Sequence, residues 1–80
     1  MKTVSAAYLL GIRDERQLLN EAKARGELDR GFAREILANI EATLRQGFSG
    51  EMAQYMRGGR DFWRNQIKRM QCDELSLQPC

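Results

Sequence analysis

Apolar residues recur every three or four positions along most of the chain, which is the spacing of one face of an α-helix. This pattern runs from Thr3 to Met70, and the single proline, Pro79, lies beyond it. No stretch shows the alternation of β-branched residues that is typical of strands. We therefore predict an all-α fold of two to three amphipathic helices, arranged as a helical hairpin or a small bundle.

Capping and stop signals give the predicted helix boundaries. The first helix is expected over residues 5–25 and ends at Gly26, since glycine readily adopts the left-handed conformation that follows a helix. The second begins near Asp29, whose carboxylate can cap free amides, and ends at Gly47. The third is expected over residues 50–70.

Glycines also occur inside the predicted helices. Gly11 lies within the apolar stripe of the first helix, and the Gly58–Gly59 pair interrupts the third. Either feature could mark a bend or a place where another helix packs closely. We favour close packing for the pair. Residues 1–70 then form a single helical domain, and residues 71–80 are predicted to be a loose acidic tail.

A chain of 80 residues buries a modest core. Domains this small usually need a disulfide, a metal, self-association or very regular helix packing. The two cysteines, Cys72 and Cys80, both lie in the predicted tail, and the chain contains no histidine. We therefore predict no metal and no cofactor, and expect dimerisation to complete the fold.

Positive charge is concentrated in the third helix. Seven basic residues oppose seven acidic ones up to Leu44, whereas residues 45–70 hold six basic residues and two acidic ones. Ten of the thirteen cations are arginine, the side chain that suits planar, bidentate contacts at interfaces. This distribution favours an acidic protein surface or a phosphate backbone as partner. Glu41 and Arg45 have the spacing of an ion pair within one helix.

The third helix separates into two arcs when its residues are placed around the helix axis. The apolar arc consists of Met52, Met56, Gly59, Trp63, Ile67 and Met70. The basic arc consists of Arg57, Arg60, Arg64 and Lys68. An apolar arc is usually core, and a row of arginines is usually a solvated face, but aromatic residues and arginine also dominate binding interfaces. The candidate partner-binding residues are Tyr55, Arg57, Arg60, Trp63, Arg64 and Lys68.

Catalysis and membrane insertion are not expected. There is no histidine base, and no serine or cysteine has an evident activating partner. The apolar run at residues 4–12 is short and ends directly in the charged run 13–16, which argues against a signal peptide. No segment has the length of a membrane span. These features predict a cytoplasmic, non-enzymatic binding protein.

Several segments resemble small accessory proteins of Mu-like temperate phages. They are residues 8–13, 39–41 and 48–52, and above all 57–66, within a resemblance that covers about residues 4–69. It implies a helical dimer that acts in the host cell by binding and inhibiting a host regulatory protein. A LuxR-type quorum-sensing activator, blocked by an anti-activator, and the type IV pilus assembly ATPase are the targets it suggests. The tail with its two cysteines departs from the family pattern.

Two alternatives remain. A helix-turn-helix DNA-binding regulator would also have short helices with a basic last one. Its recognition helix would concentrate polar residues near its N-terminus, whereas here that turn is Gly50–Ala53 and contains Glu51. A structural or assembly protein of the virion is the other alternative.

Overall fold

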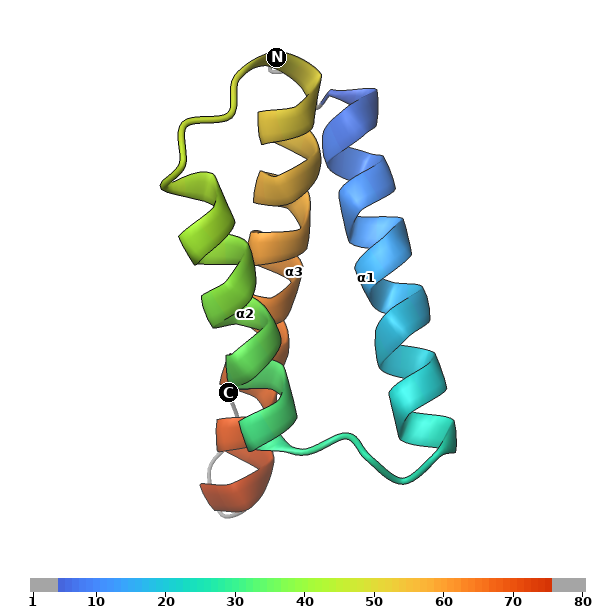
Figure 1. The fold of residues 1–80 in the computed structure, drawn as a ribbon. Helices are drawn as coiled ribbons and strands as arrows, with labels where there is room; N and C mark the ends of the chain where they lie inside the picture. The colour runs from blue at the N-terminus through green and yellow to red at the C-terminus, as the bar shows by residue number, and fades with distance from the viewer. Residues whose placement is uncertain (1–4, 76–80) are drawn as a thin grey trace.

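The structure is a computed structural model that describes residues 5–75, with the side chains of residues 5–71. The described part consists of three α-helices: α1 (Ala6–Ala24), α2 (Arg30–Leu44) and α3 (Gly50–Leu75) (Figure 1). Within these residues there is no strand, which confirms the all-α prediction. No described helix is long and apolar enough to cross a bilayer.

Local signals explain where the first two helices begin and end. The Ser5 hydroxyl accepts a hydrogen bond from the amide of Tyr8 (3.3 Å), and the Asp29 carboxylate accepts one from the amide of Phe32 (2.7 Å). Each cap satisfies an amide that has no partner inside its own helix. Helix α1 also ends close to Gly26, as predicted. Gly26 adopts the left-handed conformation, with a φ of 71°.

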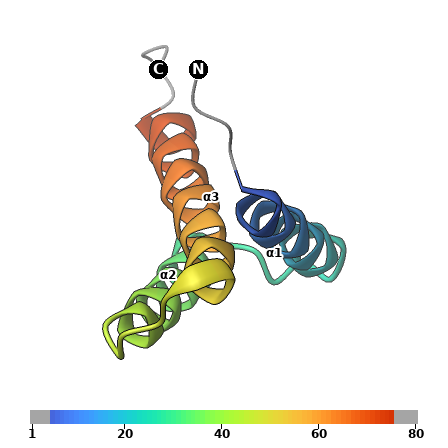
Figure 2. The same cartoon turned by 90° about the horizontal axis from the view of Figure 1, so that it is seen from above.

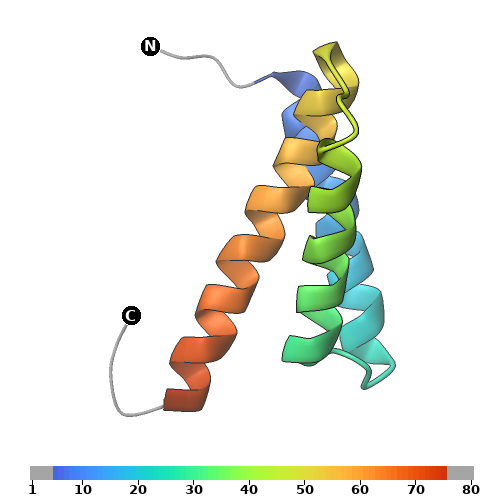
Figure 3. The ribbon, with the colours of Figure 1, turned by 60° about the vertical axis from the view of Figure 1, so that its left-hand side comes forward.

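Helix α3 is the central element of the fold. Both α1 and α2 pack on α3, whereas the backbones of α1 and α2, over the described residues, do not come close to one another. Helix α1 runs in the same direction as α3, and α2 runs in the opposite direction (Figure 1). Viewed from above, α1 and α2 lie on different sides of α3 (Figure 2), and a third view shows the C-terminal part of α3 diverging from them (Figure 3).

The crossing of α1 and α3 is a contact of backbone against backbone. A Cβ atom added at Gly58 would overlap the carbonyl oxygen of Tyr8, and one added at Gly11 would overlap that of Tyr55. Helix α3 runs through Gly58 and Gly59 without interruption. The structure therefore supports the close-packing interpretation of the glycine pair, because the missing side chains let the two helix axes approach.

A single large side chain lies at the centre of the core. Trp63 is fully buried, and its ring meets those of Phe62 and Phe32 edge-on at centroid distances of 5.4 and 6.2 Å. Its indole N–H donates to a carboxylate oxygen of Glu15 at 2.8 Å, so the one polar atom of the ring is satisfied. Alanines Ala22, Ala33 and Ala53 complete the set of buried apolar residues.

Helix α3 ends later than predicted. It extends to Leu75 rather than Met70, because no glycine or proline follows until Pro79 and the polar residues after Met70 are compatible with a helix. Loss of the apolar pattern ends a buried face and does not by itself end a helix. The side chains of Cys72 and Cys80 and the end of the predicted tail, residues 76–80, lie outside the described residues.

We predict that Gly58→Ala destabilises the protein. The added methyl group overlaps backbone atoms of α1, which cannot rotate away as a side chain could. Overpacking of this kind costs roughly 1–3 kcal/mol of unfolding free energy, and in a domain of this size it lowers the melting temperature by about 5 °C or more.

Gly31→Ala is the matched control, because Gly31 is exposed in α2 and its added methyl group would meet only the side chain of Asp29. Its unfolding free energy should stay within about 1 kcal/mol of that of the parent. Thermal melts followed by circular dichroism give both values. A Gly58→Ala protein as stable as the parent would contradict the close crossing.

Candidate functional site

The face of α3 that α1 and α2 leave uncovered is positively charged. Arg57, Arg64 and Lys68 are exposed on it, and Arg60 is partly buried at its edge. These four residues, which share one face of the helix, are called the basic face below. It is the part of the predicted site that the structure brings together.

The two aromatic candidates lie elsewhere. Trp63 belongs to the core and presents no surface to a partner, which corrects its assignment as a contact residue. The apolar arc that contains Trp63 faces the core formed with α1 and α2. Met52, at the start of α3, belongs to the same arc but is 55% exposed. Tyr55 is partly exposed, and its hydroxyl donates a hydrogen bond to the carboxylate of Asp14 on α1.

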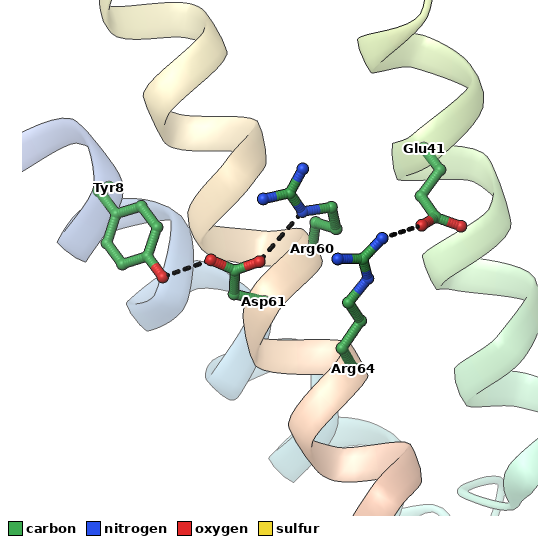
Figure 4. Close-up of polar contacts among 5 residues, drawn as sticks. All are labelled: Tyr8, Glu41, Arg60, Asp61 and Arg64. Atoms are coloured by element: carbon green, nitrogen blue, oxygen red, sulfur yellow. Dashed lines mark hydrogen bonds and ion pairs between the residues drawn. The ribbon is translucent and has the colours of Figure 1, made fainter.

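Acidic side chains engage two members of the basic face. The Arg60 Nε–H donates to a carboxylate oxygen of Asp61 at 3.0 Å, and the other oxygen of Asp61 accepts from the Tyr8 hydroxyl at 2.6 Å (Figure 4). Arg64 donates to Glu41 of α2 at 2.8 Å. The pair predicted between Glu41 and Arg45 is replaced by this contact between helices. Ion pairs across helices depend on packing, so sequence spacing could not reveal them.

The remaining cations of the basic face are unopposed. Among the side chains that the structure describes, Arg57 and Lys68 take part in no ion pair. Both are exposed, on the same side of α3. They therefore supply the positive field that an acidic partner surface would meet first.

One further cation near this face is not predicted by the helical pattern of α3. Arg45, at the end of α2, lines a shallow hollow of about 340 Å³ together with Glu41, Leu44, Arg60 and Arg64. The residue was assigned to a pair within its own helix, so its position opposite α3 could not be seen. Three arginines from α2 and α3 thus line one open hollow.

Both tyrosines are held protonated by carboxylates. The hydrogen bond to Asp61 raises the pKa of Tyr8, with a smaller contribution from burial and a partial opposition from Arg60. The hydrogen bond to Asp14, with burial and the charges of Asp14 and Glu15, raises the pKa of Tyr55 to about 12. Each phenol joins α1 to α3 as a donor, a role that its deprotonation would end.

Comparisons of the chain with known protein families, with characterised proteins and with solved structures found no match. The relationship to phage accessory proteins therefore stays a prediction.

We predict that Tyr55 titrates near pH 12. The chain has two tyrosines, so in a Tyr8→Phe variant Tyr55 alone contributes to an ultraviolet absorbance titration. The midpoint should lie at about 12 and move toward about 10 when Asp14→Ala is added.

The stability of the fold should depend on the protonation of the Tyr55 hydroxyl. A folded-state pKa above the unfolded value means that the stabilisation is fully present below pH of about 10 and is lost as pH rises from there towards 12. Melting temperatures of the Tyr8→Phe protein should fall over that range more steeply than those of Tyr8→Phe/Tyr55→Phe. A midpoint near 10 with Asp14 present would contradict the hydrogen bond.

Proposed function

We propose that this protein binds an acidic surface of a host regulatory protein through the basic face of α3 and thereby inhibits it. One observation carries the proposal: Arg57 and Lys68 are exposed on an uncovered helix face and have no acidic partner among the described residues. Exposed arginines on a preformed surface bind with little loss of conformational freedom in the backbone.

The position of the basic face also supports binding of a protein. It lies on the central helix, which both α1 and α2 hold in place, so it is presented on a rigid support. Of the two aromatic candidates, Trp63 is buried in the core and Tyr55 is hydrogen-bonded to Asp14 on α1. Charge complementarity, rather than aromatic anchoring, is therefore the basis of recognition that we propose.

The inhibitory role and the host setting rest on the resemblance to phage accessory proteins. That resemblance suggests a LuxR-type quorum-sensing activator or the type IV pilus assembly ATPase as the target in the host cytoplasm. A specific DNA-binding role has less support, because Asp61 and Glu41 neutralise two of the four cations on the basic face and would repel a phosphate backbone.

We further propose that the working unit is a homodimer. Only one large side chain of the described monomer is fully buried, and four large apolar residues are exposed. Burial of such residues against a second copy would supply the apolar contact area that a small domain lacks. The exposed residues are Leu9, Leu10, Phe48 and Met52.

The dimer prediction can be checked by sedimentation equilibrium at micromolar concentration. We expect twice the monomer mass of 9.2 kDa, and a shift toward the monomer mass when Leu9 and Leu10 are both replaced by Gln. A parent protein that sediments as a monomer over this concentration range would contradict the proposal.

The binding prediction uses a variant that removes the unopposed charges. Arg57→Gln/Lys68→Gln should weaken capture of the host target by at least about tenfold, because charged interface residues of this kind contribute strongly when they meet an acidic surface. Affinity is measured against a purified LuxR-type activator and a purified pilus ATPase.

The control is Arg13→Gln/Lys23→Gln, which removes one arginine and one lysine that are exposed on α1. It makes the same change in net charge and should alter affinity by less than about twofold if the basic face is the contact. Equal loss in both variants would show that net charge, and not the basic face, determines binding. Failure of both purified proteins to bind the parent would contradict the proposed targets.

A further inference from the structure

The hollow between the end of α2 and the middle of α3 has donors that no internal contact uses. Arg60 donates its Nε–H to Asp61, and Arg64 donates from one terminal nitrogen to Glu41. A guanidinium group carries five N–H donors. Each of these two arginines therefore retains N–H groups that no described protein atom accepts.

These two arginines lie next to each other on α3. Figure 4 shows the head groups of Arg60 and Arg64 beside one another on the flank of α3, and both line the same hollow. Arg45, at the end of α2, also lines this hollow, and it takes part in no ion pair among the described side chains. Three arginines thus line about 340 Å³ of open space.

We propose that this hollow is the anchor site for a carboxylate side chain in an acidic segment of the partner protein. The carboxylate would accept hydrogen bonds from Arg45, Arg60 and Arg64, and an apolar residue next to it would pack on Leu44. This inference rests on the proposed function, in that the partner is a protein, and it adds the position and chemistry of the contact.

The charge balance favours a single carboxylate over a nucleic acid. Glu41 lines the hollow, and Asp61 lies beside Arg60, so the positive field is strong at one point and is interrupted on either side. A nucleic acid brings a phosphate at every step along its backbone, and the neighbouring phosphates would meet these carboxylates. The apolar wall provided by Leu44 suits a protein side chain.

Glu41 is itself a carboxylate bound by one of the arginines of the hollow. Its carboxylate lies 2.8 Å from the Arg64 terminal nitrogen, the position that an incoming carboxylate would take. The pair is partly exposed, with 55% of the Arg64 side chain accessible, so it can be displaced at small cost. Glu41 is therefore an internal competitor, and its neutralisation should strengthen binding rather than weaken it.

The test uses the full chain and a defined probe. Side-chain Nε–H signals of the arginines are followed by nuclear magnetic resonance while a blocked Glu-Leu-Glu tripeptide is added, with Gln-Leu-Gln as the uncharged match. We expect saturable shifts of the Arg45, Arg60 and Arg64 signals with the glutamate peptide alone. Arg16, which lies over the Phe62 ring, serves as the internal reference and should not shift.

Three variants separate an anchor site from general attraction. Glu41→Gln should tighten peptide binding by about fivefold, and Arg45→Gln should weaken it by about tenfold. Arg13→Gln makes the same charge change on α1, at an exposed position outside both the hollow and the basic face, and should alter affinity by less than about twofold.

Equal losses in Arg45→Gln and Arg13→Gln, or no effect of Glu41→Gln, would overturn the proposal. So would the absence of saturable shifts in the parent. A short oligothymidylate that shifts the same three signals at lower concentration than the peptide would reassign the hollow to phosphate and also overturn it. Capture of a host protein is measured in a separate experiment. Peptide binding without capture would refute the proposed function alone. Capture without peptide binding would refute the anchor site alone.

Discussion

Backbone contact between α1 and α3 at Gly11 and Gly58 sets the geometry of the whole molecule. Because no side chain separates the helices there, their axes come close, and carboxylates of α1 reach groups on α3. Glu15 accepts from the indole of Trp63, and Asp14 accepts from Tyr55. A wider crossing would leave the indole N–H buried without an acceptor, which is costly. Gly11 and Gly58 thus allow the close helix approach that the core around Trp63 requires.

The same packing decides how the charges of α3 act. Helix α2 brings Glu41 to Arg64 and places Arg45 on the opposite side of a hollow. The four cations of the basic face therefore differ: Arg60 and Arg64 form ion pairs, whereas Arg57 and Lys68 form none among the described side chains. Attraction of a partner and anchoring of its side chain can then depend on different arginines. In the binding mode proposed above, this division would separate attraction of the partner from anchoring of its side chain.

We expect stability and the proposed binding to depend on different residues. The buried aromatic residues hold the three helices together, and the basic face contributes little to folding because exposed ion pairs are weak. Replacement of Arg57 or Lys68 should therefore leave the fold intact, whereas replacement of a core residue would confuse loss of binding with unfolding. The small size of the core is also the reason why exposed apolar residues on α1 and at the start of α3 are suited to self-association.

Local information in the sequence was sufficient to predict the helical class, the approximate helix boundaries and the cap at Asp29, because periodicity and capping act within a few residues. It also placed Arg57, Arg60, Arg64 and Lys68 on one face. Only tertiary structure decided that Trp63 is buried while Met52 of the same arc is exposed, and that Glu41 pairs with Arg64. Burial and pairing between helices depend on which faces meet, and that is determined by contacts between residues far apart in the chain.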